Sequence, residues 1–256
     1  MNLELKQTTR KRIPIKLGLK GMSGSGKSLS SLLISKILCG GDVSKIAVID
    51  SENAIMLYAS IIGNFNVLNL SQPHSIERYL QAIEICEKAG MEVIIIDSIS
   101  HCWHYLLQLH GSMQGNSFTN WQRITPLHNA FVQKIQQSPC HIICTMRSKT
   151  DYLMQTQNGK TTIEKVGLKA IQRPEIEYEF TTVLSIDMNH KAKAVKDRSG
   201  LFMDKPEFVI TEATGKMILD WCNGGLAVNE AKLLQEKPII HNLNPNNYGS
   251  ITAQAS

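Results

Sequence analysis

The stretch GMSGSGKS, residues 21–28, decides the fold, because it matches the pattern GxxxxGK[ST] in spacing. The apolar run from Ile13 to Leu19 before it predicts a strand, and apolar residues at helical spacing between Ser28 and Leu38 predict a helix after it. Glycines let such a loop wrap around phosphate oxygens, and the following helix points the positive end of its dipole at them. A plain glycine–serine linker is the weaker alternative.

The loop predicts a nucleotide site with ATP and Mg²⁺ as its ligands. Lys27 is expected to reach the β- and γ-phosphates, and the Ser28 hydroxyl is expected to bind the Mg²⁺ that bridges them. The residues expected to touch the nucleotide are Gly21, Met22, Ser23, Gly24, Ser25, Gly26, Lys27, Ser28 and Leu29.

Two further apolar runs end in carboxylates. The run VIIIDS, residues 93–98, predicts a buried strand that delivers Asp97 to the carboxyl edge of a sheet, where it can hold Mg²⁺ through water. The alternative is a strand-end aspartate that only starts a turn. The run IAVIDSE, residues 46–52, ends in Asp50 and Glu52, and Glu52 is the candidate for polarising the attacking water. Asp50 either orients the site or caps the next helix, and both acids could instead be helix-start residues.

The stretch HIICTMRSK, residues 141–149, predicts a third buried strand with a polar end. Thr145 is a candidate sensor of the γ-phosphate, and Arg147 and Lys149 could carry its signal into the segment that follows. An inert strand-end threonine is the alternative.

Short β-branched runs alternate with amphipathic stretches, which predicts an α/β fold with a mostly parallel sheet and helices on both faces. The second half predicts a long loop over residues 147–173 and then a strand pair, a short strand and a helix. Further elements are expected at 45–50, 75–89, 92–96, 121–137, 179–188, 193–196, 208–210, 214–222 and 228–236. We expect a basic leader over residues 1–12, one ATPase domain over 13–237 and a disordered tail over 238–256.

The chain has 256 residues, a net charge of +5, 43% hydrophobic and 19% charged residues, which is ordinary for a globular protein and excludes disorder of its bulk. The longest apolar run, Val93 to Ile96, is too short to cross a membrane, and no secretory signal is visible.

Six cysteines without a CxxC pair fit free thiols in the cytoplasm. The residues His101-Cys102-Trp103-His104, with His110, favour a partly buried helix over a metal site.

Basic residues in two segments suggest contact with nucleic acid. The segment 147–173 has six basic and two acidic residues, and its cations could neutralise phosphates of single-stranded DNA while Tyr152 stacks on a base. The cations are Arg147, Lys149, Lys160, Lys165, Lys169 and Arg173. A solvated charged loop explains them almost as well.

A second basic cluster lies on the predicted hairpin near the end of the domain. In an oligomer its cations could reach the phosphate of a neighbouring subunit, although a solvent-facing hairpin is equally consistent. They are Lys191, Lys193, Lys196 and Arg198. The run Arg10-Lys11-Arg12 fits a solvated leader better than a DNA contact.

The ordered motifs resemble a known family. The stretch IDSENAIMLYA between GMSGSGKS and VIIIDS is similar to the RecA/RadA-type ATPase core. The stretches TMRSKTDY, KVGLKAIQRPEIEYEF and KDRSGLF resemble, more narrowly, phage and prophage RecA-like AAA-family ATPases, a group that includes core-only single-strand annealing recombinases. The resemblance covers residues 13–225.

The resemblance implies a RecA-like P-loop fold with antiparallel strands in the C-terminal part, and an ATPase that needs ATP and Mg²⁺. Lys27 and Ser28 would bind the nucleotide and Mg²⁺, Glu52 would be the catalytic glutamate and Asp97 the Walker B acid. Thr145 would be the sensor, where RecA has a glutamine. The implied partners are single-stranded DNA, a single-strand-binding protein and further copies of the chain in a ring or filament, with no membrane.

These observations predict an ATPase, stimulated by single-stranded DNA, that assists recombination, annealing or repair. Two alternatives remain open: a nucleotide-dependent loader or switch in phage replication or packaging, and a small P-loop kinase.

Overall fold

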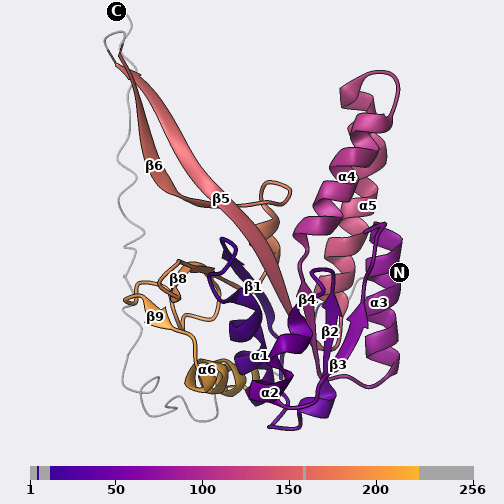
Figure 1. Ribbon diagram of the computed structural model, residues 1–256, viewed down its shortest axis with the longest axis vertical. Coiled ribbons are helices and arrows are strands. Elements are labelled where there is room, and N and C mark those ends of the chain that lie inside the picture. Colours follow the sequence, from indigo (N-terminus) through magenta and orange to yellow (C-terminus); the bar gives the residue numbers. More distant parts are fainter. Residues whose placement is uncertain (1–4, 6–11, 158–159, 225–256) are drawn as a thin grey trace, which may run out of the picture. The chain divides into compact units, whose positions relative to one another are not determined.

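The computed structural model describes residues 5, 12–157 and 160–224, with the backbone alone between 151 and 166 (Figure 1). The predicted leader over 1–12 lies largely outside the described residues. The predicted helix over 228–236 and the predicted tail over 238–256 lie wholly outside them, as does the end of the predicted domain after residue 224.

A nine-stranded sheet organises the chain in the order β3-β2-β4-β5-β1-β7-β8-β9, with β6 paired to β5. Neighbours from β3 to β7 pair in parallel, and β6, β8 and β9 add antiparallel pairs. This confirms the predicted fold class. The strands are β1 (Lys16–Gly21), β2 (Ile46–Asp50), β3 (Asn66–Asn69), β4 (Val93–Asp97), β5 (His141–Gln157), β6 (Lys160–Ala170), β7 (Thr182–Ile186), β8 (Lys191–Asp197) and β9 (Phe208–Val209).

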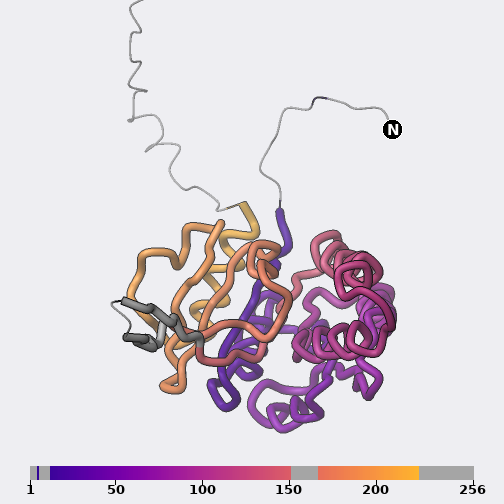
Figure 2. Tube along the Cα trace, turned by 90° about the horizontal axis from the view of Figure 1, so that it is seen from above, coloured from indigo at the N-terminus to yellow at the C-terminus, as the bar shows by residue number. Residues whose placement is uncertain are grey.

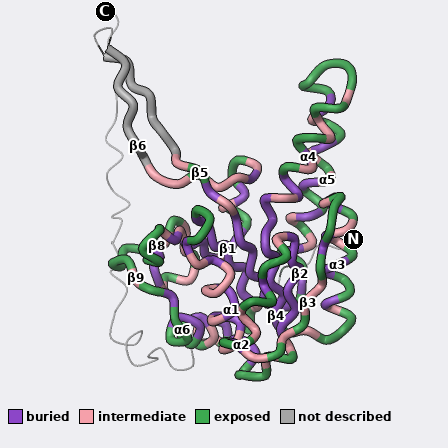
Figure 3. Tube along the Cα trace, viewed as in Figure 1, coloured by how far each residue is buried: buried purple, intermediate pink, exposed green. Residues whose placement is uncertain are grey.

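Helices cover both faces of the sheet, because apolar residues point to both sides of its strands. Along β2, Ala47 and Ile49 pack with α3, α4 and α5, whereas Ile46 and Val48 pack with α1 and α6. Figure 3 shows the central strands β1, β2 and β4 mostly buried, in purple. The helices are α1 (Lys27–Leu38), α2 (Ala59–Ile62), α3 (Ile76–Lys88), α4 (Ser100–Ser112), α5 (Ser117–Gln137) and α6 (Glu212–Cys222), with 3-10 turns η1 (Val43–Lys45), η2 (Ile55–Tyr58) and η3 (Ile176–Glu179).

The first strand lies in the middle of the fold. In Figure 2 the orange segment that holds β7 to β9 and the magenta helices α4 and α5 lie on opposite sides of the indigo β1. Because β5 flanks β1 and β4 flanks β5, the loop that follows β1 lies at the carboxyl edge of the parallel sheet, beside Arg147 of β5 and near the end of β4. The order of the strands therefore brings the predicted motifs to one edge.

The segment 147–173 differs from its prediction as a loop. Most of it forms two long antiparallel strands, since β5 continues from the core to Gln157 and pairs with β6 from Ser148↔Ala170 to Gln157↔Lys160. The sequence does contain a hairpin signal, because Asn158-Gly159 stands between threonine-containing runs. These runs lack the periodic apolar residues of a buried strand face, and this obscured the signal. Strand β3 was also not predicted, because it is a short and half-exposed edge strand.

No helix among the described residues is long and apolar enough to cross a membrane. The six cysteines, all within the described part of the chain, are buried.

Candidate nucleotide site

The loop after β1 has the conformation that its motif predicts. Gly24 and Gly26 have φ angles of 82° and 91°, in the left-handed region that favours glycine. At Gly21 a Cβ atom would lie 2.4 Å from Ser25 Oγ and 2.6 Å from the Ile186 carbonyl oxygen, so a larger residue cannot enter without displacing the loop. The loop therefore forms a tight cradle ahead of α1.

Lys27 begins α1 and folds back over this loop. Its Nζ donates a hydrogen bond of 2.8 Å to the Met22 carbonyl. Burial lowers the pKa of Lys27, against the opposing charges of Asp97 and Glu52. A phosphate that replaced the Met22 carbonyl would give this buried amine a charged partner.

Asp97 lies between the first turn of α1 and β5. Ser28 Oγ donates to Asp97 Oδ2 at 2.5 Å, and Thr145 Oγ1 donates to the other carboxylate oxygen. Asp97 is 4% exposed, and burial raises its pKa in spite of both hydrogen bonds. A hydroxyl beside a buried carboxylate is an all-oxygen donor set of the kind that Mg²⁺ prefers, so the residues fit the predicted metal.

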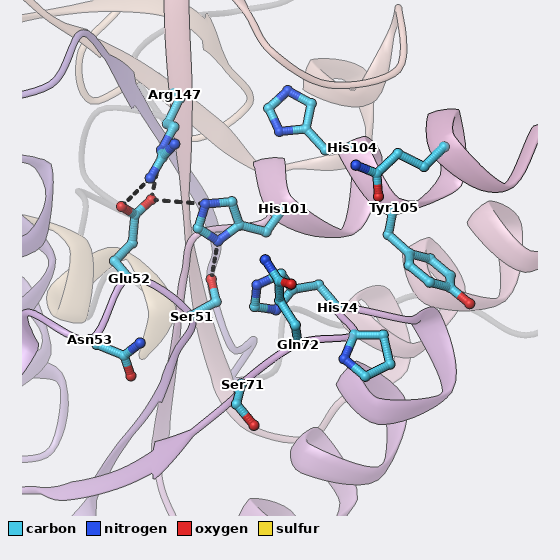
Figure 4. Close-up of a pocket in the computed structure, with 12 residues that line it drawn as sticks. Ser51, Glu52, Asn53, Ser71, Gln72, His74, His101, His104, Tyr105 and Arg147 are labelled. Carbon is cyan, nitrogen blue, oxygen red and sulfur yellow. Dashed lines mark hydrogen bonds and ion pairs between the residues drawn. The ribbon is translucent and has the colours of Figure 1, made fainter. Parts of the chain in front are cut away.

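Glu52 is held by several donors (Figure 4). Ser98 Oγ and Arg147 Nε donate to its Oε1 at 3.0 and 2.8 Å, Arg147 Nη2 donates to Oε2, and His101 Nε2 lies 3.8 Å from Oε1. Burial raises the pKa of Glu52, but Arg147, Ser98 and His101 together outweigh burial and leave it below its ordinary value. The carboxylate is therefore ionised and paired.

Asp50 builds the turn that presents Glu52. Its Oδ1 accepts the backbone N–H groups of Glu52 and Asn53 at 2.8 Å, and its Oδ2 accepts those of Ala54 and Ile55 at 3.1 Å. The sequence left two roles open for Asp50, orienting the site and capping the next helix, and the geometry supports capping.

One cavity of about 560 Å³ joins these groups. Lys27, Ser28, Glu52 and Asp97 all line it, although β2, β4 and α1 are far apart in the sequence. Other predicted nucleotide contacts in its wall are Ser23, Gly24, Gly26 and Leu29, whereas Gly21, Met22 and Ser25 are not part of the wall.

Seven wall residues were not predicted from the sequence: Ser30, Leu33, Ala54, Tyr58, His190, Val209 and Ile210. Tyr58 is the last residue of η2, His190 directly precedes β8, and Ile210 directly follows β9. His190 Nδ1 lies 3.1 Å from the Ser25 carbonyl oxygen, 165 positions away, so no local pattern could have identified it. Thr145 is fully buried and is not in the cavity wall, and its contact is with Asp97.

The cations predicted to meet DNA lie in different surroundings. Lys149 and Lys169 are exposed and face each other across β5 and β6. Arg147 pairs with Glu52, and Arg173 is half-buried with Nη2 3.3 Å from Thr125 Oγ1. The side chains of Tyr152, Lys160 and Lys165 lie outside the described part of the structure.

The second basic cluster lies on the predicted hairpin, formed by β7 and β8. Lys191 and Lys193 are exposed, whereas Lys196 and Arg198 both donate to the Tyr178 carbonyl oxygen. None of the four lines the nucleotide cavity. Within the described ranges, no three His, Cys, Asp or Glu residues gather as a metal site. The helix predicted around His101 is α4.

Comparison with known proteins places these features in context. A family model described as AAA domain matches residues 13–213. No curated protein matches the sequence. Among solved structures, a KaiC-like protein from the hyperthermophilic archaeon Pyrococcus horikoshii OT3 is similar at 14% identity and a TM-score of 0.46, over 78% of this chain and 92% of that one.

Proposed function

The chain belongs to the AAA domain family, and we propose that it is a P-loop ATPase of the RecA-like type that hydrolyses ATP while bound to single-stranded DNA. In this proposal, ATP hydrolysis serves the recombination, annealing or repair of DNA. The observation that carries the proposal is the convergence of Lys27, Ser28, Asp97 and Glu52 on one cavity.

The residues in the cavity have separate tasks in hydrolysis. Lys27 and the loop amides bind and orient the phosphates, and the γ-phosphorus is attacked by water as its bond to the β–γ bridging oxygen breaks. Glu52 accepts the proton of that water, for which its ionised carboxylate is suited. Ser28 and Asp97 would hold Mg²⁺, which supplies charge neutralisation at the phosphate oxygens when bound. Thr145 keeps Asp97 oriented through its hydrogen bond.

The β5–β6 hairpin supports the proposed contact with DNA. Lys149 and Lys169 occupy directly paired positions, where like charges repel, and neither forms an ion pair with a described residue. A phosphate between them would relieve that repulsion. We extend the proposal to a phage or prophage origin, a cytoplasmic location, a ring or filament of copies and a single-strand-binding protein as partner, on the sequence resemblance alone.

The test is ATP turnover with and without single-stranded DNA at two salt concentrations. We expect phosphate release without any added acceptor, a faster rate with DNA, and a weaker DNA effect at high salt because cation–phosphate contacts release counterions. Phosphate that appears only on an added acceptor would instead identify a kinase. No stimulation, together with no DNA retention at low salt, would favour a loader or switch.

A further inference from the structure

A second cavity, of about 850 Å³, adjoins the nucleotide site and shares Glu52 and Arg147 with it. Its walls come from the turn after β2, the segment 71–74 after β3, and α4 (Figure 4). It therefore opens at the carboxyl edge of the sheet, where open α/β folds bind ligands. Its volume suits a small molecule or one unit of a polymer.

The walls of this cavity offer flat rings and neutral polar groups. The imidazoles of His74 and His101 stack with centroids 4.9 Å apart, and Tyr105 adds a phenol. Gln72 and Gln108 add amides, which both donate and accept hydrogen bonds. Rings and amides of this kind stack on a nucleobase and bind its edge.

Charge in the cavity favours an anion over a cation. Among the described residues of its wall, Glu52 is the only carboxylate, and Arg147 already neutralises it. The Arg147 side chain is 41% exposed, so a ligand can reach its guanidinium. A phosphate accepts the same forked pair of hydrogen bonds that Arg147 now gives to Glu52.

Further cations continue outward from Arg147. Lys149 follows it by two residues on β5, which puts both side chains on one face of the strand, and Lys169 lies opposite Lys149 on β6. Three cations in succession suit consecutive phosphates of a DNA strand. A single nucleotide could bind Arg147 but would leave Lys149 and Lys169 without a phosphate.

We propose that this cavity binds one nucleotide unit of single-stranded DNA, with its base against the α4 wall and its phosphate on Arg147. The inference rests on the proposed function and adds a mechanism to it. The phosphate competes with Glu52 for Arg147, so DNA releases the carboxylate to act on water while Ser98 still orients it. Arg147 is thus a positioning residue that couples the DNA to hydrolysis.

The experiment compares variants of the cavity wall on the full-length protein. His104→Ala and Gln108→Ala change exposed residues of α4, and Gln81→Ala on α3 is the matched control outside the cavity. The probe is an oligothymidylate longer than about 16 nucleotides, the upper site size of a single-strand-binding fold. The double variant of His104 and Gln108 should need about tenfold more DNA for half-maximal stimulation, with unchanged turnover in the absence of DNA.

The Arg147→Ala variant and a photocrosslinking experiment provide two further, independent tests of the proposed DNA site. Arg147→Ala should lose the stimulation by DNA whatever its basal rate, and an oligothymidylate carrying 5-iododeoxyuridine should crosslink to residues 71–74 or 101–108. Thymidine monophosphate, as the alternative source of the same chemistry, should not stimulate turnover. Stimulation by the monophosphate would overturn the assignment to a DNA strand.

The outcomes separate this inference from the proposed function. If the wild type binds DNA and is stimulated by it, while the wall variants behave like Gln81→Ala and crosslinks map elsewhere, the cavity assignment is wrong and the proposed function stands. If the wild type neither retains DNA nor responds to it, both are wrong.

Discussion

Ser28 and Asp97 are 69 positions apart in the sequence, and their side chains share a hydrogen bond of 2.5 Å. Ser28 lies in the first turn of α1, which follows β1, and β5 lies between β1 and β4 in the sheet. Asp97 therefore reaches across β5, where Thr145 donates to its second oxygen. One carboxylate thus joins the end of β4, the body of β5 and the start of α1 beneath the predicted phosphate site.

Lys27→Ala should abolish nucleotide binding or turnover. The variant removes the only lysine among the described residues of the cavity wall, and with it the amine that would bind the phosphates. Binding of a fluorescent ATP analogue and phosphate release measure the effect. Lys88→Ala, which removes an exposed lysine from the end of α3, is the control and should behave as wild type. Normal turnover by Lys27→Ala would exclude this loop as the phosphate site.

Glu52→Gln should keep ATP binding and lose most hydrolysis. Glutamine retains the size of the side chain and can still accept from Ser98, but it cannot take a proton from water. We expect turnover to fall by about 10²–10⁴-fold, measured as steady-state phosphate release beside an equilibrium binding assay. Glu84→Gln on the exposed face of α3 serves as the control. Turnover at the wild-type rate would show that Glu52 is not the base.

Gly215→Ala should destabilise the protein at the contact between α6 and α1. A Cβ atom there would lie 2.9 Å from Ile37 Cβ and 3.1 Å from the Ile34 carbonyl oxygen. Overpacking of this kind costs about 1–3 kcal/mol, which exceeds the gain of up to about 1 kcal/mol in helix propensity. Thermal denaturation measures the change.

The matched control for that variant is Gly111→Ala in α4, where an added Cβ atom meets nothing within 4 Å. Its melting temperature should stay the same or rise. A drop in melting temperature as large as that of Gly215→Ala would show that close packing is not the cause.

Stability should fall as the pH decreases from about 6.5 to about 4, the ordinary and the folded-state pKa of two buried histidines. Burial, with Arg12 and Lys16 nearby, lowers the pKa of His141 to about 4, and burial beside Arg173 does the same for His128. The unfolded chain then binds more protons than the folded one, so stability is complete above the unfolded pKa and is lost below it. Each histidine contributes on the order of 3 kcal/mol.

Chemical denaturation at a series of pH values tests this dependence. His141 Nδ1 accepts a hydrogen bond of 3.1 Å from the Ile15 backbone, and His141→Asn keeps an acceptor there without a titrating group. The variant should lose less stability than wild type over this pH range. Parallel curves for the two proteins would show that His141 does not titrate in the predicted way.

Local sequence patterns were sufficient for the phosphate loop and the strands that present the acids. A glycine-rich loop between a strand and a helix has one workable conformation, and apolar runs such as Val93 to Ile96 have to be buried. The segment around Asn158-Gly159 was predicted as a loop although that dipeptide is a local hairpin signal, because the polar runs around it lack the periodic apolar face that makes such a signal plain.

The sequence by itself determined the fold class and identified Lys27, Ser28, Glu52 and Asp97 as candidate site residues, because each lies within a short motif next to its own strand or helix. Only the tertiary structure decided what each residue faces. Arg147 meets Glu52 from 95 positions away because β2 and β4 end at the edge of the parallel sheet where β5 passes through Arg147 on its way to the hairpin. That contact, and the second cavity beside it, depends on the order of strands in the sheet, which no local pattern encodes.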